Sequence, residues 1–313
     1  MKIWFGLDKP AGYPLGAAVT IGNFDGVHCG HHHILQRLKS EADSRGLPAL
    51  AVVFEPQPPE FFAAKSGRPL PYRLSPLRDK LDLLRQTACL DGVWVLRFNQ
   101  SFADMQAQEF IDRLLRERLD TRYLLIGDDF RFGAGRVGDF SLLQQQAGMV
   151  TESTPSVMVA SGRASSTAVR QALKAGDIRQ VEQILGHHYT LSGHVKHGKK
   201  LGRTIACPTA NVHLPAHSYA LSGVFVVEVS GRFGRKRGVA NFGYNPTVGE
   251  LPSPQLEVHI FDFDQEIYGE RIQVHFRHKI RDEAKFGSMD EMMRHISADM
   301  DAARNWFECG FVG

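Results

Sequence analysis

The sequence predicts a two-domain protein, in which an α/β domain with a mainly parallel sheet precedes a mainly antiparallel β domain with a closing helix. Three observations lead to this prediction. The chain has 313 residues, and a domain takes roughly 150. Strand and helix patterns alternate in the first half, whereas short strands separated by turn residues follow one another from Tyr189. We therefore expect a boundary near Gly186, with domains over 1–186 and 187–313.

In the first half, apolar runs predict the strands, and apolar residues at helical spacing predict the helices between them. The expected strands are Ala17–Ile21, Ala49–Phe54, Val93–Leu96 and Tyr123–Ile126. The expected helices are His31–Arg45, Leu77–Ala88 and Ala103–Leu119. This order implies a parallel sheet with helices on both faces, which binds ligands at the carboxyl ends of its strands.

In the second half, short strands with turn residues between them predict an antiparallel barrel or sandwich. The expected strands are Leu191–Lys196, Gly223–Val229, Lys236–Asn241, Leu256–Phe261 and Arg271–Phe276. A helix over Gly287–Phe307 is expected to close the chain. Two helical segments, Ser166–Ala175 and Asp177–Leu185, lie between the halves and are split by Gly176.

Composition excludes several function classes. Lysine and arginine number 37, and aspartate and glutamate 34, so the formal net charge is only +3. This balance argues against nucleic acid or an anionic membrane as the main partner. The cysteines at positions 29, 89, 207 and 309 form no CxxC pair, which favours a reducing, cytoplasmic setting. No signal peptide is expected, and no apolar run approaches the ~18 residues of a membrane span.

The clearest motif is Gly-Asn-Phe-Asp-Gly-Val-His-Cys-Gly-His at residues 22–31, where the first strand runs into the first helix. Glycines let a backbone approach phosphate closely, and a helix N-terminus offers N–H groups. We expect this loop, with Gly22, Phe24 and Gly30, to bind the phosphates of a nucleotide. His28 and His31 would donate to an oxyanion, which predicts nucleotidyl transfer. The plain alternative is a glycine turn before a capped helix with surface histidines.

A second phosphate-binding segment is expected at the start of the helix after residue 164. Its hydroxyls are suited to cap the helix, but with an arginine one turn later they also suit a triphosphate. The residues are Ser165, Ser166, Thr167 and Arg170.

The segment 197–211 predicts a phosphate flap followed by a metal site. Glycines and basic residues, including Gly198, Lys199 and Gly202, are expected to cover phosphates. Thr209 and Asn211 follow on one face and offer the hard oxygen ligands that Mg²⁺ prefers. A basic surface loop before a strand is the structural alternative.

Residues 22–31 resemble the signature of the bacterial bifunctional riboflavin kinase/FMN adenylyltransferase (FAD synthetase) family. Pro-Thr-Ala-Asn at 208–211 resembles the riboflavin kinase motif of the same family, and further segments resemble it in order along nearly the whole chain. The resemblance implies a nucleotidyltransferase-like parallel-sheet domain that adenylylates FMN over 1–186. It also implies a β-barrel riboflavin kinase domain over 187–313.

The resemblance also implies roles for several loop residues. Gly127–Gly133 is similar to the family segment near the adenine and ribose. There Asp129 would accept a hydrogen bond from the nucleotide, and Arg131 would neutralise the charge of a phosphate. The Pro-rich loop after the second strand is similar to the family's flavin-side loop. Its implied flavin contacts are Pro56, Pro58 and Phe62.

In the second half, the resemblance implies that Glu257 is the catalytic base. Glu257, His259 and Phe261 share one strand face, and a carboxylate facing into a barrel would be costly without a task. Without the resemblance, a solvent-facing Glu on an edge strand is the preferred reading. Arg281 and Glu283 would pair structurally or touch the flavin edge.

The expected partners are small molecules. ATP would serve both steps and Mg²⁺ would bind at Thr209 and Asn211, riboflavin would give FMN and ADP, and FMN would give FAD and pyrophosphate. We expect no nucleic acid and no membrane as partner, and a monomer or a weak homo-oligomer.

The motifs by themselves leave other functions open. The histidine motif alone also fits adenylyl or cytidylyl transfer to another phosphorylated acceptor, and a flavin-binding regulator with inactive sites would share the pattern. Gly133–Gly138 matches the GxGxxG of dehydrogenases but does not follow its strand directly. Gly193–Lys199 has P-loop spacing, but Lys200 stands where Ser or Thr is needed.

Overall fold

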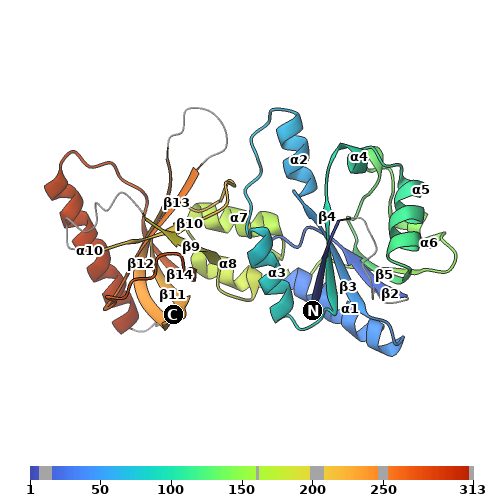
Figure 1. Cartoon of the computed structure of the whole chain (residues 1–313), viewed down its shortest axis with the longest axis horizontal. Coiled ribbons are helices and arrows are strands. Elements are labelled where there is room, and N and C mark those ends of the chain that lie inside the picture. Colours follow the sequence, from blue (N-terminus) through green and yellow to red (C-terminus); the bar gives the residue numbers. More distant parts are fainter. Residues whose placement is uncertain (7–15, 160–161, 198–207, 246–252, 310–313) are drawn as a thin grey trace. The chain divides into compact units, whose positions relative to one another are not determined.

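The computed structural model describes residues 1–6, 16–159, 162–197, 208–245 and 253–309, which form two compact units (Figure 1). The first unit contains Met1–Pro71 and Lys80–Ser165, and the second contains Tyr72–Asp79 and Ser166–Gly313. The second unit thus begins before the expected boundary near Gly186 and includes a segment from inside the first half. The functional boundary at residue 186 stays a prediction.

The first unit contains a six-stranded sheet in which all paired strands run parallel, as expected. The sheet has the order β1-β4-β3-β2-β5-β6. The strands are β1 (Lys2–Phe5), β2 (Ala17–Ile21), β3 (Ala49–Glu55), β4 (Gly92–Arg97), β5 (Thr121–Gly127) and β6 (Val150–Thr154). The chain moves outward from β2 in both directions, so β2 and β5 flank the point where the strand order reverses. Ligands bind beyond the carboxyl ends of strands at such a point.

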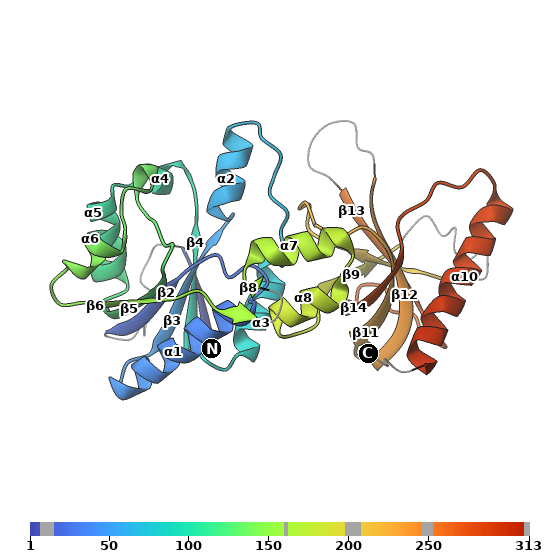
Figure 2. The ribbon, with the colours of Figure 1, turned by 180° about the vertical axis from the view of Figure 1, so that it is seen from behind.

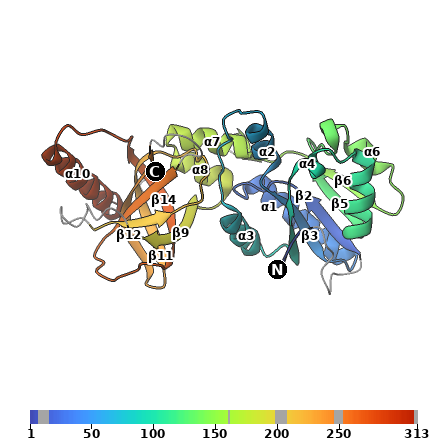
Figure 3. The same ribbon diagram turned by 45° about the horizontal axis from the view of Figure 1, so that its top comes forward.

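Helices cover both faces of this sheet, with α3 on one face and α5 and α6 on the other (Figures 1 and 3). The core on the second face joins strand residues such as Val19, Val52 and Leu96 to Phe110 and Leu114 of the π-helix η1. The helices are α1 (Cys29–Ser44), α2 (Pro58–Lys65), α3 (Leu77–Gln86), α4 (Gln100–Ala103), α5 (Ala107–Glu109), the π-helix η1 (Phe110–Arg118), the 3₁₀ turn η2 (Ala134–Arg136) and α6 (Phe140–Gln144). A two-stranded ribbon adds β7 (Met158–Val159) and β8 (Gly162–Arg163).

Two expectations for the first unit were wrong. Ala103–Leu119 is not one helix, because the helical conformation is interrupted at 104–106 and continues as a short α-helix and a π-helix. The Pro-rich stretch is not only a loop, because Pro58 and Pro59 occupy the first turn of α2. Proline is tolerated there, since the first N–H groups of a helix have no partner within it.

The second unit contains a closed antiparallel barrel with the strand order β10-β13-β12-β11-β14-β9, so the barrel alternative was correct. Its elements are α7 (Ser166–Ala175), α8 (Ile178–Leu185), β9 (Thr190–Lys196), β10 (Ala210–His213), β11 (Gly223–Gly231), β12 (Gly234–Asn245), β13 (Ser253–Ile260), β14 (Arg271–Arg281) and α10 (Met289–Glu308). Helices α7 and α8 pack together beside the barrel, and α10 lies on another side of it (Figure 2). Among the described residues, no helix is long and apolar enough to cross a membrane.

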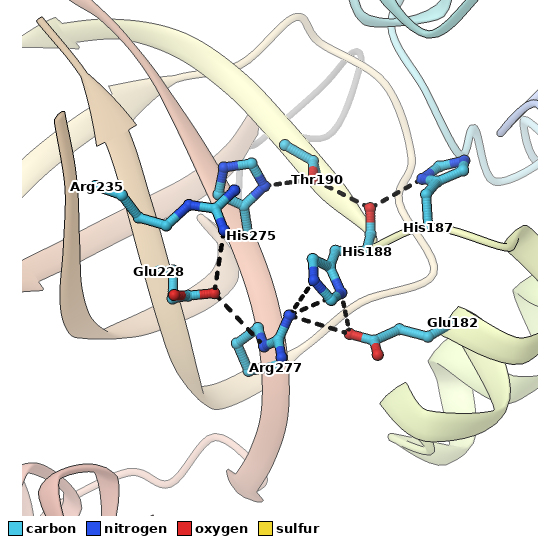
Figure 4. A network of polar contacts seen from close by, with 8 residues as sticks. All are labelled: Glu182, His187, His188, Thr190, Glu228, Arg235, His275 and Arg277. Carbon is cyan, nitrogen blue, oxygen red and sulfur yellow. Dashed lines mark hydrogen bonds and ion pairs between the residues drawn. The ribbon is translucent and has the colours of Figure 1, made fainter. Parts of the chain in front are cut away.

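A polar network attaches α8 and the residues after it to the barrel (Figure 4). His188 donates from Nδ1 to Glu182 of α8 at 2.7 Å, and its Nε2 accepts from Arg277 on β14. The Arg277 guanidinium also lies 3.7 Å from the carboxylate of Glu228 on β11. Arg277 on β14 therefore connects α8, strand β11 and His188, which lies between α8 and β9. Helix α8 thus packs with the barrel that follows it in the chain.

Candidate active sites

His28 and His31 lie together at the start of α1, beyond the carboxyl end of β2. The two imidazole rings are stacked, with centroids 3.6 Å apart. His28 is the N-cap, and its Nδ1 accepts from the His31 backbone N–H at 3.3 Å. Neutral His28 therefore carries its ring proton on Nε2. The same arrangement places the helix N-terminus and two imidazoles at one point, which suits an anionic ligand.

His31 is held in its neutral form. Burial lowers its pKa well below the usual value, and repulsion from His28, when that ring is protonated, and from Lys80 lowers it further. Its Nδ1 is buried without a hydrogen-bond partner among the described residues. A neutral imidazole still has one N–H to donate, so His31 can stabilise negative charge on a substrate without being an acid itself.

Glycine at position 30 makes room for the histidines. A Cβ at Gly30 would lie 3.1 Å from the His28 ring and 3.3 Å from the carbonyl oxygen of Ala164. The loop before it has left-handed backbone at Phe24, Gly26 and Val27. The glycine spacing of the motif is thus required by close packing around His28.

The loop after β5 lies across the switch point from the histidine loop, because β2 and β5 are neighbours. It carries Asp129 and Arg131, both exposed. Asp129 lies 3.3 Å from the guanidinium of Arg163, and Arg131 donates to the carbonyl of Phe130 at 2.8 Å. The sequence analysis missed Arg163, which no motif includes.

The predicted Ser165–Arg170 segment is divided between the units. Ser165 ends the first unit, directly after Ala164, which contacts the histidine loop. Ser166 begins α7 in the second unit, where Arg170 donates from Nε to the carbonyl of Tyr72 at 2.5 Å. Thr167, in the first turn of the same helix, is exposed.

A row of phenylalanine rings follows the carboxyl ends of β3 and β4. Phe62 on α2 is 43% exposed and contacts Phe98 with ring centroids 5.7 Å apart. The row continues inward from Phe98 to Phe54 and Phe102, edge to face or tilted. Pro56 and Pro58 are partly exposed on either side of buried Gln57, where the chain passes from β3 into the first turn of α2. An exposed aromatic on a rigid aromatic base is suited to stack on a planar ring.

The second unit contains a cavity of about 280 Å³ at one end of the barrel. Thr209 and Asn211 line it beside β9 and β13, and residues 263–268 close the other side. The ring of Tyr268 lies 3.8 Å from that of His197. The sequence analysis assigned no role to 263–268, although Asp264 and Glu266 lie there, shortly after a strand. The expected flap contacts Gly198, Lys199 and Gly202 lie outside the described residues.

Glu257 does not face into the barrel, contrary to expectation. Leu256 and Val258 on either side are at most 1% exposed and fill the interior, so Glu257 points outward and is half-buried. It stands directly opposite Asn211 on β10 and Asn241 on β12. Opposite residues on antiparallel strands have Cβ atoms roughly 5 Å apart, so the carboxylate adjoins the predicted metal ligand.

Arg281 and Glu283 lie beside this outer face. Arg281 donates to both carboxylate oxygens of Asp299 on α10, at 2.9 and 2.7 Å. Glu283 lies over β12, because a Cβ at Gly243 would be 2.0 Å from its Oε1. Burial raises the pKa of the Glu283 carboxyl. Arg281 is thus held in an ion pair with Asp299. Glu283 lies above Gly243 on β12, the strand that also carries Asn241.

Comparison with protein families gives two matches. A family model described as FAD synthetase matches residues 12–168, and one described as riboflavin kinase matches residues 185–307.

Curated relatives are similar over nearly the full length. A bifunctional riboflavin kinase/FMN adenylyltransferase of Escherichia coli K12 is 47% identical over 297 residues, which cover 93% of each chain. One from Haemophilus influenzae is 44% identical over 296 residues, covering 93% of this chain and 94% of the relative. A solved structure described as a macrolide-efflux protein from Streptococcus pneumoniae has a TM-score of 0.82 at 28% identity. It covers 98% of this chain and 100% of its own.

Proposed function

Because the chain belongs to the bifunctional riboflavin kinase/FMN adenylyltransferase family, we propose that its two reactions use the residue sets described above. The protein phosphorylates riboflavin to FMN with ATP, and adenylylates FMN to FAD with release of pyrophosphate. ATP and the flavins are therefore its substrates and products. We assign FMN adenylylation to residues 1–186 and riboflavin phosphorylation to 187–313.

For adenylyl transfer, the assignment rests on the stacked histidines at the switch point of the sheet. The FMN phosphate attacks the α-phosphorus of ATP, a new P–O bond forms, and the bond to pyrophosphate breaks. The attacking group is already anionic, so this step needs no general base. Negative charge builds on the α-phosphoryl oxygens, where donors fixed in advance stabilise the transition state most. His28 and His31 are those donors.

Other residues of the first half retain their sequence-based roles. Gly22, Phe24 and Gly30 shape the phosphate loop, Asp129 and Arg131 contact the nucleotide, and Phe62 with Pro56 and Pro58 holds the flavin ring. Ser165, Ser166, Thr167 and Arg170 hold the leaving pyrophosphate. Support comes from the loops after β2 and β5, which share the switch point, and from the exposed edge of the phenylalanine row.

For riboflavin phosphorylation, the assignment rests on the opposition of Asn211 and Glu257 across β10 and β13. Glu257 takes the proton of the ribityl 5′-hydroxyl as that oxygen attacks the γ-phosphorus, and ADP leaves. The outward position of Glu257 supports this role, since a carboxylate there can meet a substrate. Gly198, Lys199 and Gly202 cover the phosphates, and Arg281 and Glu283 border the flavin.

The residues present suit Mg²⁺. Thr209 and Asn211 offer neutral oxygen ligands at a cavity, which fits an ion that keeps several waters and binds substrate phosphates. Bound there, Mg²⁺ would neutralise charge on the β- and γ-phosphates. Thr209 and Asn211 orient the phosphates beside Glu257.

The division between the sites is tested by separating riboflavin, FMN and FAD by chromatography after incubation with ATP. Asn211→Ala should raise the Mg²⁺ concentration needed for half-maximal FMN formation and leave the Mg²⁺ dependence of FAD formation unchanged. Asn305→Ala, on an exposed position of α10, is the matched control. Equal changes in both reactions would contradict the assignment.

We also propose a cytoplasmic enzyme that acts on small molecules alone, as a monomer or a weak homo-oligomer. The balanced charge and the isolated cysteines support this setting. Sedimentation at micromolar concentration tests the oligomeric state, and a stable large assembly would contradict it.

A further inference from the structure

Two histidines that have no role above face each other on the outside of the barrel, one same-face position along β10 from Asn211. His194 on β9 stands directly opposite His213 on β10 in antiparallel register. Both side chains are exposed, whereas Val195 and Val212, the next opposed pair along the two strands, are buried. Side chains at opposed positions share a face, with Cβ atoms roughly 5 Å apart. The two imidazoles can therefore reach a common point in solvent.

One of the rings is already oriented as a ligand. His194 donates from Nδ1 to the backbone carbonyl of Gly269 at 2.9 Å. This hydrogen bond places the proton on Nδ1 and leaves the lone pair on Nε2, on the opposite side of the ring. Metal-binding histidines usually have such a carbonyl or carboxylate partner, which fixes the tautomer and the ring direction.

The surrounding charges permit a cation. Arg271 faces His194 from β14, but its guanidinium is paired with Asp79, 2.8 Å away. Lys196, two residues from His194, stands opposite Asn211, and its positive charge reaches His213, where it adds to burial in lowering the pKa. Among the described residues no cluster of three or more His, Cys, Asp or Glu side chains could hold a metal, so this pair would supply two ligands and water the rest.

We propose that His194 and His213 bind one divalent transition-metal ion of the zinc, nickel or copper class. Imidazole nitrogen suits these ions and is a poor ligand for Mg²⁺, so the site is chemically distinct from the magnesium site proposed at Thr209 and Asn211. The ion joins β9 to β10, the two strands connected by residues 197–209. Occupancy fixes β9 and β10 to each other beside Asn211 and slows FMN formation, an effect that rests on the proposed role of Asn211.

Binding is tested by isothermal titration of the full chain with Zn²⁺ in the presence of millimolar Mg²⁺. His194→Gln and His213→Gln should each weaken one binding event by about 100-fold, because the second ligand acts at a high effective concentration. His33→Gln, an exposed histidine of α1, should leave that event unchanged. If either barrel variant retains the wild-type affinity, the site is refuted.

The restraint has a separate readout. Zn²⁺ that saturates the pair should slow FMN formation in the wild type but not in the His194→Gln/His213→Gln double variant, which should turn over normally without zinc. FAD formation from FMN should be equally sensitive to zinc in both proteins. A wild-type FMN rate unaffected by bound zinc would refute the restraint, while loss of zinc affinity in the variants would still support the site.

Discussion

The two proposed sites differ in how the fold brings their reactive groups together. In the first unit, the site lies at a loop–helix junction, where left-handed backbone and Gly30 allow two imidazoles to stack at a helix N-terminus. In the second unit, Asn211 and Glu257 lie on regular strands and meet because the antiparallel register places them opposite each other. Sheet topology locates the first site, whereas strand alternation and register locate the second.

This difference predicts how each site fails. A junction site depends on backbone shape, so small changes of side-chain size near it disturb several groups together. A register site depends on single side chains, and replacing one leaves its neighbours in position. The following experiments, ordered by expected effect, test this contrast.

Glu257→Gln should produce the largest loss. Removing a general base costs about 10²–10⁴-fold in rate, and glutamine keeps the size of the side chain and its place on β13. FMN formation from riboflavin should fall by that factor, while flavin binding, measured by fluorescence quenching, is retained. FAD formation from added FMN is the internal control. Normal phosphorylation by the variant would make this carboxylate structural.

His28→Ala should reduce FAD formation from FMN by about 10²–10³-fold, the cost of losing one transition-state donor. It also removes the N-cap that accepts from the His31 N–H, so both donors are disturbed. FMN formation from riboflavin, measured on the same preparation, should be unchanged. If FAD formed at the wild-type rate, the histidine pair would not act on the α-phosphate.

Asp79→Ala tests the segment that the first half contributes to the second unit. Asp79 is 8% exposed and accepts from the Ser192 backbone N–H and from Arg271. Its loss leaves Arg271 without that carboxylate, which should lower the free energy of unfolding by about 3 kcal/mol in urea denaturation. Asp82→Ala on the same helix breaks an exposed pair with Arg85 and should cost about 0.5 kcal/mol or less. Equal effects would contradict the anchoring role.

Acid should destabilise the barrel through His275. Burial lowers its pKa to about 4, and the positive charges of Arg235 and Arg277 add to the effect. Below pH 6.5 the unfolded chain binds a proton that the native state does not, so stability falls as the pH drops from 6.5 to 4. The loss is up to about 3 kcal/mol.

His275→Gln removes this titration, so its unfolding free energy should vary less between pH 7 and 4.5 than that of the wild type. Exposed His278→Gln is the control and should retain the wild-type slope. Identical slopes for the wild type and His275→Gln would show that His275 is protonated in the native state.

Phe62→Ala should have the smallest effect. Stacking on one aromatic ring contributes about 0.5–1.5 kcal/mol, so the KM for FMN in FAD formation should rise about 3- to 10-fold. The KM for riboflavin in the other reaction should not change. Phe5→Ala, which removes an exposed ring of β1, is the control. An unchanged KM for FMN would place the flavin elsewhere.

The sequence predicted the sheet class, the barrel and most element bounds, because apolar periodicity reports burial directly. Ala17–Ile21 and Ser166–Ala175 match β2 and α7 at both ends. Strand β10 was missed because four residues carry too short a pattern. The π-helix could not be distinguished from an α-helix in the sequence, because its apolar residues have a similar spacing.

The candidate sites were predictable as motifs but not as arrangements. Leu256 and Val258 flank Glu257 on one strand, and their side chains must fill the barrel interior. Because side chains alternate along a strand, this pattern by itself predicts that Glu257 points outward. The opposition of Asn211 and Glu257 required the strand register, which local sequence does not encode. The Phe98 and Phe102 base under Phe62, and the pairing of Arg163 with Asp129, depend on contacts between distant segments.

The anchoring of Asp79 has a consequence for the chain as it leaves the ribosome. Its partner Ser192 is synthesised 113 residues later, which at 5–20 residues per second takes about 6–23 s. During that interval the first unit can fold, but Tyr72–Asp79 has no barrel to join. Translation therefore imposes an order in which this segment waits in solvent. A ribosome stalled between residues 165 and 192 would present it to proteases.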